Sequence, residues 1–159
     1  MPVIKLQTFI KAKPEIVFNL SCSIDLHVAS TKQTNEKAIK GVTTGLINLN
    51  EQVTWRAKHF GVCFQLTSKI TAFKFPYYFI DEMVKGPFAK MRHEHHFYNE
   101  NGETKMLDVF EYISPLGWFG ALADKIFLEN YLHSFLKQRN LVIKNIAENN
   151  KWKLYIEQK

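Results

Sequence analysis

The sequence predicts an α+β domain in which a strongly curved antiparallel sheet packs against one long C-terminal helix. Two observations predict this fold class. Between about residue 35 and residue 113, polar and apolar residues alternate with a period of two, as in strands with one buried face. After Ser114-Pro115 the apolar residues recur at helical spacing instead. With 159 residues, the chain is long enough to bury its own core as a single domain.

The N-terminal part indicates one strand followed by short helices. Residues 3–10 (VIKLQTFI) predict the first strand. A short helix is expected from Lys13-Pro14-Glu15 onward, because proline suits the first helical turn and glutamate complements the helix dipole there. Residues 22–34 are compatible with either a second short helix or a loop.

The alternating region predicts a series of hairpins. The stretch VTWRAKHF ends at Phe60-Gly61, which allows a tight turn. Pairing His59 with Val62 places Trp55 opposite Leu66, so the apolar faces of the two strands coincide. Further strands are predicted at about 77–84, 88–98 and 103–113.

The C-terminal region predicts a helix over residues 118–148, which at ~1.5 Å per residue would be about 45 Å long. Its apolar stripe is formed by Leu128, Leu132, Phe135, Val142 and Ile146. Arg139 lies near this stripe, and we expect it to extend its charge to solvent rather than to pair with a carboxylate. Residues 150–159 form a tail whose aromatic residues are expected to pack on this domain or, in a homodimer, on a second subunit.

Composition and charge exclude several classes of protein. The net charge is +6, but the lysines are spread along the chain among acidic residues, so no nucleic-acid partner is expected. No apolar run is long enough for a membrane span. The N-terminus alternates and carries lysines, so it is interpreted as a strand and not a signal peptide. The two cysteines are too few for a disulfide scaffold, which predicts a cytoplasmic location.

The stretch HEHH contains three of the six histidines and lies on the strand at 88–98. The pleat places His93 and His95 on one face and Glu94 and His96 on the other. A four-residue loop at 99–102 would pair His93 with Asp108, whereas a two-residue turn would pair His95 with Asp108. In either register Asp108 lies on the inner face with the two histidines.

Two histidines and a carboxylate are ligands that suit zinc or iron. His59 is three strands away, about 14 Å at ~4.8 Å per strand, which is too far for a shared ion. Asp81 is a better further ligand, but a simple hairpin at Lys85-Gly86 would turn Glu82 inward in its place. No metal and no cofactor are therefore predicted. A buried His beside Asp could instead move protons, or could hold the polar end of a ligand.

Several stretches of the chain resemble a known superfamily. These are FIKAKPEIVFNL, EKAIKGVTTGLI, EQVTWRAKHFG, FIDEMVKGPFAKMRHEHHF, TKMLDVFEYISPLGWFG and the closing IKNIAEN. Together with the order of the elements, they resemble the START/birch-pollen-allergen superfamily of helix-grip proteins (SRPBCC). The resemblance is to a bacterial branch of cyclase/dehydrase-type or cell-division-labelled domains, and it covers residues 3–149.

The resemblance implies one START-like domain over residues 1–149, with residues 150–159 as a C-terminal tail. It further implies a curved seven-stranded sheet wrapped around the long helix, two short helices after the first strand, a hydrophobic cavity between sheet and helix, and no cofactor. Ligands would enter near the start of the long helix, at Gly117, Trp118 and Gly120. The residues expected to contact a ligand are Trp55, His59, Phe64, Leu66, Asp81, Met91, His93, His95, Phe97, Met106, Asp108, Phe110, Tyr112 and Trp118.

Three functions follow as hypotheses from the sequence and the resemblance. The first is the binding or transport of a small hydrophobic, lipid-like molecule, without catalysis. The second is a cyclase- or dehydrase-like enzyme in which His93, His95 and Asp108 carry the acid–base chemistry. The third is a regulatory protein-interaction module that uses the basic surface and the aromatic tail.

Overall fold

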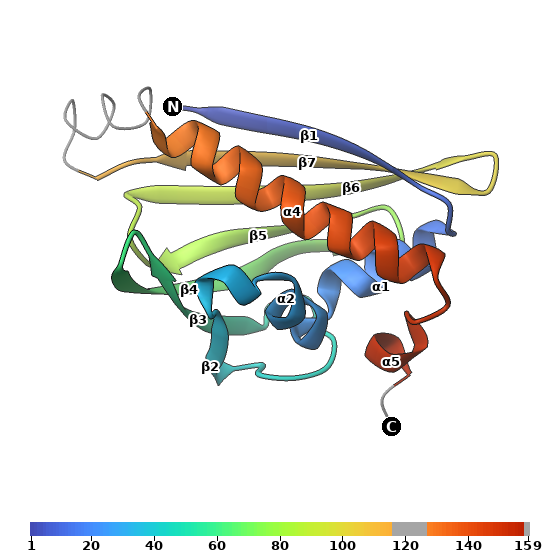
Figure 1. Ribbon diagram of the computed structural model, residues 1–159, viewed down its shortest axis with the longest axis horizontal. Coiled ribbons are helices and arrows are strands. Elements are labelled where there is room, and N and C mark those ends of the chain that lie inside the picture. Colours follow the sequence, from blue (N-terminus) through green and yellow to red (C-terminus); the bar gives the residue numbers. More distant parts are fainter. Residues whose placement is uncertain (116–126, 158–159) are drawn as a thin grey trace.

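The centre of the molecule is a single sheet of seven antiparallel strands in the order β1-β7-β6-β5-β4-β3-β2. The structure is a computed structural model, and it describes residues 1–115 and 127–157. The strands β2 to β7 form a meander, and β1, the first strand of the chain, pairs with the outer edge of β7 (Figure 1). Their bounds are β1 (Val3–Ile10), β2 (Lys37–Gly41), β3 (Gln52–His59), β4 (Val62–Lys74), β5 (Tyr78–Lys85), β6 (Lys90–Glu100) and β7 (Glu103–Ile113).

The helices lie on one face of this sheet. The long helix α4 (Glu129–Glu148) crosses the strands diagonally, and the two short helices that follow β1 lie against it (Figure 1). These are α1 (Pro14–Cys22) and α2 (Ile24–Ser30), followed by the single-turn 3-10 helix η1 (Lys32–Thr34). The predicted α+β fold, with a seven-stranded sheet wrapped around a C-terminal helix, is therefore confirmed.

The registers of two hairpins decide which side chains face the helix. In the β3–β4 hairpin, His59 pairs with Val62 and Trp55 with Leu66, as predicted. In the β6–β7 hairpin, Glu100 pairs with Glu103, so the turn has two residues. Both turn residues of this second hairpin have positive φ, which suits its Asn-Gly sequence. Of the two registers left open by the sequence, the structure has the one that pairs His95 with Asp108.

The face of Asp81 is settled by the connection between β5 and β6. Asp81 pairs with His93 and Glu82 pairs with Arg92, so Asp81 points to the helix side of the sheet. The residues between Lys85 and Lys90 make a longer connection than a two-residue hairpin. The simple hairpin that would have turned Glu82 inward is therefore not formed.

Helix α4 is rotated relative to the predicted stripe. Its buried residues are Leu136, Arg139, Asn140, Ile143 and Ala147. The predicted stripe members Leu128, Leu132, Phe135, Val142 and Ile146 are only half-buried and flank this line. Two of the buried residues are polar: Arg139, which was expected near the stripe, and Asn140, for which no prediction was made from the sequence. The predicted start of the helix at residue 118 lies outside the described residues.

The C-terminal tail packs on its own domain. Helix α5 (Lys153–Ile156) follows α4, and Trp152, Tyr155 and Ile156 lie against the core beneath α1. Ser23 Oγ donates a hydrogen bond to the carbonyl oxygen of Tyr155 at 3.4 Å. The aromatic residues of the tail are thus partly buried against the core of the same chain.

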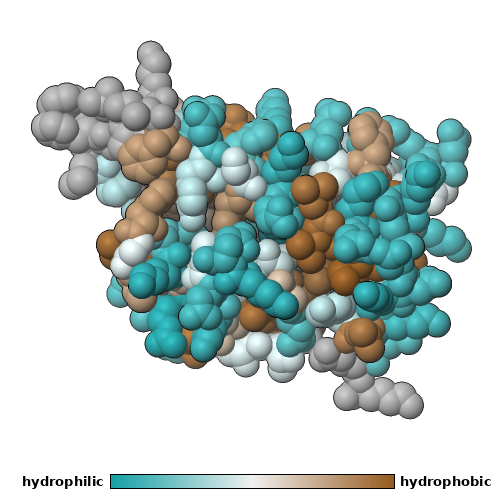
Figure 2. All heavy atoms as spheres, viewed as in Figure 1, coloured by the Kyte–Doolittle hydropathy of each residue, from teal (hydrophilic) through white to brown (hydrophobic). Residues whose placement is uncertain are grey.

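The surface is mixed in character. On the face shown in Figure 2, hydrophilic residues dominate and hydrophobic residues form small groups among them. In the described parts of the chain, no helix combines the length and apolarity needed to cross a membrane.

Candidate functional site

A cavity of about 390 Å³ lies between the sheet and α4. Its volume is within the ~300–1,000 Å³ typical of small-molecule sites. Most of its wall is apolar, and the sequence-predicted wall residues Trp55, Phe64, Leu66, Met91 and Phe110 all line it. The register of the hairpins explains this, because these positions alternate onto the face that α4 covers.

Three polar residues on neighbouring strands meet in the wall of this cavity. Asp81 comes from β5, and His93 and His95 come from β6. The Oδ1 atom of Asp81 lies 3.4 Å from His95 Nε2 and 3.9 Å from His93 Nδ1. The sequence left Asp81 in doubt, and the structure brings it to the two histidines.

Asp108 on β7 lies behind these histidines. Its side chain is 1% exposed and does not line the cavity. His93 Nε2 lies 3.1 Å and His95 Nδ1 2.8 Å from Asp108 Oδ1. The first contact has hydrogen-bond geometry, whereas the second is close but poorly aligned. The predicted contact between histidine and Asp108 is formed, and it involves both inward histidines.

Asn140 of α4 completes the arrangement. Its Nδ2 atom donates a hydrogen bond of 2.6 Å to Asp108 Oδ2. Asn140 is 2% exposed, and its Oδ1 atom has no hydrogen-bond partner among the described residues. This hydrogen bond ties the helix to the polar cluster of Asp81, His93, His95 and Asp108.

The electrostatics of the cluster favour ionised carboxylates beside an uncharged imidazole. Burial alone would raise the pKa of Asp108, but the hydrogen bonds and charge of His93 and His95 hold it well below its usual range. The pKa of Asp81 is also lowered. Burial alone would raise it, but the hydrogen bond from His95 and the neighbouring charges outweigh burial. Burial, together with the neighbouring His95, lowers the pKa of His93 to about 4. At neutral pH His93 is therefore uncharged.

Aromatic neighbours fix the two imidazole rings. His95 stacks on Phe79, with ring centroids 4.3 Å apart and an interplanar angle of 21°. His93 meets the edge of Phe110 at 5.1 Å, and the two imidazole centroids are 3.8 Å apart. The rings are thus held by packing as well as by Asp108.

Arg139 is buried in the cavity wall, and the prediction that it reaches solvent is wrong. It is 6% exposed. It donates a hydrogen bond of 3.4 Å to the carbonyl oxygen of Ser21, and its charge acts on both Asp81 and the Cys22 thiol. Arg139 faces the sheet because it is seven residues from both Leu132 and Ile146 and so shares their side of α4.

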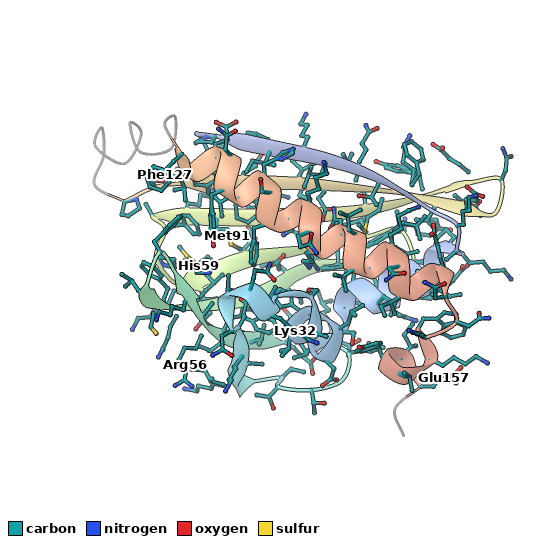
Figure 3. All side chains as sticks on the ribbon, viewed as in Figure 1. Lys32, Arg56, His59, Met91, Phe127 and Glu157 are labelled. Atoms are coloured by element: carbon teal, nitrogen blue, oxygen red, sulfur yellow. The ribbon has the colours of Figure 1, made fainter. Side chains whose placement is uncertain are left out.

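Aromatic residues gather at the end of the cavity where α4 begins. His59 Nδ1 and the Tyr131 hydroxyl are 2.6 Å apart, and the Phe60 ring lies 4.5 Å from Tyr131 and 5.4 Å from Phe127. Phe60 is 58% exposed and Phe127 is 47% exposed, although both line the cavity. Figure 3 shows His59 and Phe127 toward this end of the molecule. Trp118, Gly117 and Gly120, which the resemblance assigned to the entrance, lie outside the described residues.

Other predicted ligand contacts lie beneath the cavity wall. Phe97 and Met106 are almost fully buried in the core around Phe18, and Tyr112 belongs to a second core group with Phe88. None of Phe97, Met106 and Tyr112 lines the cavity. They share the inner face of the sheet with the wall residues, but helix α1 covers the part of the sheet that holds Phe97 and Met106.

The cavity wall has a second polar position, which was not predicted from the sequence. His27 Nε2 of α2 lies 3.2 Å from Glu36 Oε2, and the His27 ring stacks on Trp55 at 4.1 Å. Burial would raise the pKa of Glu36, but the charge and hydrogen bond of His27 lower it. His27 lies in the segment 22–34, which the sequence left open as a short helix or a loop, and Glu36 lies at the start of the alternating region.

The seven-stranded sheet, the helix that it wraps around and the cavity between them define the helix-grip fold of START-like and birch-pollen-allergen-like proteins. The resemblance noted in the sequence is confirmed at the level of the fold.

Solved structures share this fold across nearly the whole chain. One is the Zhui aromatase/cyclase from Streptomyces sp. R1128, with a TM-score of 0.74, 11% identity, and coverage of 94% of this chain and 95% of the other. The TTHA0849 protein from Thermus thermophilus has a TM-score of 0.71 at 16% identity, covering 92% and 99%. Ginseng major latex-like protein 151 from Panax ginseng has a TM-score of 0.68 at 16% identity, covering 92% and 97%. No family model and no curated protein matches the sequence.

Proposed function

We propose that the protein binds a small, uncharged hydrophobic molecule that carries one hydroxyl or carbonyl group. The observation that carries this proposal is the cavity itself, whose wall is apolar apart from a few converging polar side chains. Burial of an apolar ligand against such a wall contributes roughly 25 cal/mol per Å² of apolar surface removed from water.

The polar group of the ligand is inferred from the side chains that face it. Asp81 offers a carboxylate oxygen and Arg139 a guanidinium, and both line the cavity. A hydroxyl group can donate to the first and accept from the second. A ligand carboxylate would face the charge of Asp81, so an uncharged molecule is favoured. The exposed rings of Phe60 and Phe127 support an entrance at the start of α4.

Fluorescence of N-phenyl-1-naphthylamine, an uncharged aromatic probe, tests the proposal. Wild-type protein should bind the probe saturably at one site. Ala57 lines the cavity, so Ala57→Phe should weaken binding at least about tenfold because the added ring takes up cavity volume. Its neighbour Arg56 is exposed on the other face of β3, so Arg56→Phe should leave the affinity within about twofold.

Competition against the bound probe tests the polar group. The compound 2-naphthol should displace the probe at a concentration about tenfold or more below that of naphthalene, because a hydrogen bond to a charged group contributes ~1.5–3 kcal/mol. Equal displacement of the probe by both compounds would contradict the inference that the polar side chains bind a hydroxyl group of the ligand. Equal probe binding by Ala57→Phe and wild type would contradict use of the cavity.

A second candidate function is a cyclase- or dehydrase-like reaction. The supporting observation is the buried His93, uncharged at neutral pH, with Asp108 behind it and the cavity in front. The aromatase/cyclase with the same fold adds support from fold alone. Turnover of a poly-β-ketone model substrate should then fall at least about 100-fold in His93→Gln. Absence of turnover by the wild type, or unchanged turnover in this variant, would refute the enzymatic hypothesis.

A further inference from the structure

We infer that Asp81, His93 and His95 bind a divalent transition-metal ion of the zinc or iron class. The site would have three protein ligands and one position open to the cavity. This reverses the expectation from the sequence that no metal is bound. The inference does not rest on the proposed hydrophobic ligand, because it concerns an ion bound by the protein alone.

The ligand atoms are spaced as such an ion requires. The three side chains each present one ligand atom, and these atoms all lie within 4.8 Å of one another. Two ligands that are each ~2.0–2.1 Å from a tetrahedral ion are about 3.4 Å apart. The observed separations from Asp81 Oδ1 are 3.4 Å to His95 Nε2 and 3.9 Å to His93 Nδ1. Small side-chain rotations would therefore complete the coordination.

The tautomer of His93 suits a metal ligand. Its Nε2 atom hydrogen-bonds the Asp108 carboxylate, which can only accept, so Nε2 donates and Nδ1 of the neutral ring presents a lone pair on the side of Asp81. His95 Nε2 instead donates to Asp81 Oδ1 at 3.4 Å, so an ion bound there would displace this proton, as metal binding to histidine does. The proton can move to His95 Nδ1, which lies 2.8 Å from Asp108 Oδ1.

The surroundings of the histidines are those of metal ligands. In metal sites the second ring nitrogen of a ligating histidine is commonly held by a carboxylate, which fixes the tautomer and the orientation of the ring. Asp108 holds His93 in this way through Nε2, lies 2.8 Å from His95 Nδ1, and is itself held by Asn140. The three ligands line the cavity, whereas Asp108 lies behind them. Asp108 is thus a positioning residue and not a ligand.

The charge and the atom types narrow the identity of the ion. The Asp81 carboxylate supplies a negative charge to a cation, and its oxygen and the two imidazole nitrogens form a mixed oxygen and nitrogen ligand set. Two imidazole nitrogens favour zinc or iron over calcium or magnesium, which prefer oxygen ligands.

Titration of the metal-free protein with Co²⁺, followed by visible absorption, and with Zn²⁺, followed by calorimetry, tests this site. The wild type should bind one equivalent. Asp81→Asn keeps the shape of the side chain but weakens the ligand, and His95→Gln removes one. Both should lower affinity by more than about 100-fold, whereas Asp108→Asn should lower it by about 10–100-fold, as expected for an outer-shell residue.

His96→Gln provides the matched control. His96 lies on the same strand and has its own carboxylate partner, Glu94, at 2.7 Å, but both lie on the opposite face of the sheet. Its affinity for Zn²⁺ should equal that of the wild type. Absence of saturable binding by the wild type would overturn the inference. The contact between His95 and Asp81 would then be a hydrogen bond with no metal role. Unchanged affinity in Asp81→Asn, or a loss confined to His96→Gln, would overturn it as well.

Discussion

The hydrogen bond from Asn140 to Asp108 should be a major tie between helix α4 and the sheet. Asn140→Ala removes the donor from Asp108 Oδ2, an oxygen that is buried with the rest of this carboxylate. A hydrogen bond to a charged group contributes ~1.5–3 kcal/mol, and a buried charge left without its partner cannot regain the bond from solvent. The higher helix propensity of alanine offsets about 0.6 kcal/mol of this loss.

An exposed asparagine in the same helix isolates the effect. Asn145 is exposed, and its side-chain oxygen accepts a hydrogen bond from Asn149. Asn145→Ala has the same gain in helix propensity but loses no buried hydrogen bond. In urea unfolding at neutral pH, Asn140→Ala should therefore be less stable than Asn145→Ala by about 1.5–3 kcal/mol. Equal free energies of unfolding for the two variants would refute the role assigned to Asn140.

The remaining predictions concern other parts of the chain. Iodoacetamide should modify the exposed Cys63 in the folded protein but not Cys22, whose pKa is raised by burial; peptide mass spectrometry checks this, and early modification of Cys22 would contradict it. In urea unfolding, Gly41→Ala should lower the free energy of unfolding by about 1–3 kcal/mol more than Gly61→Ala does. Both glycines have positive φ, but of the two only Gly41 has a backbone oxygen, that of Gln52, at 2.1 Å from where the added Cβ atom would lie. The pKa of Glu36 is lowered in the folded protein, so its ionised form stabilises the fold above pH 4.5, and this stability is lost as the pH falls through the lowered pKa. Glu36→Gln should therefore lose less stability than the wild type between about pH 5 and pH 3 in urea unfolding. Identical pH profiles for the two proteins would contradict this.

The alternation of the strands made the inner wall predictable. The pleat alone separated His93 and His95 from Glu94 and His96, and Asp108 was expected inside in either register. Turn length decided the register, since Asn-Gly forms a two-residue turn. These features are local, so a single sequence contains them.

What the sequence could not give depends on long-range packing. The face of Asp81 follows from the length of the connection to β6, which has no strong turn signature. Arg139 and Asn140 are buried because contact with the sheet and the short helices sets the rotation of α4, whereas a long polar side chain beside an apolar stripe is expected by default to reach solvent. A signal was present, since Leu136, Ile143 and Ala147 define a stripe that passes through both polar positions.

Native mass spectrometry of the purified protein, before and after extraction with organic solvent, tests the central claim most directly. We expect a species heavier than the 18.6 kDa chain by the mass of a small organic molecule, which extraction removes. We also expect that the extracted protein takes up one N-phenyl-1-naphthylamine, and that Ala57→Phe does not. A mass equal to the bare chain in every preparation, with no uptake of the probe by the extracted wild type, would contradict the claim that the cavity is a ligand-binding site.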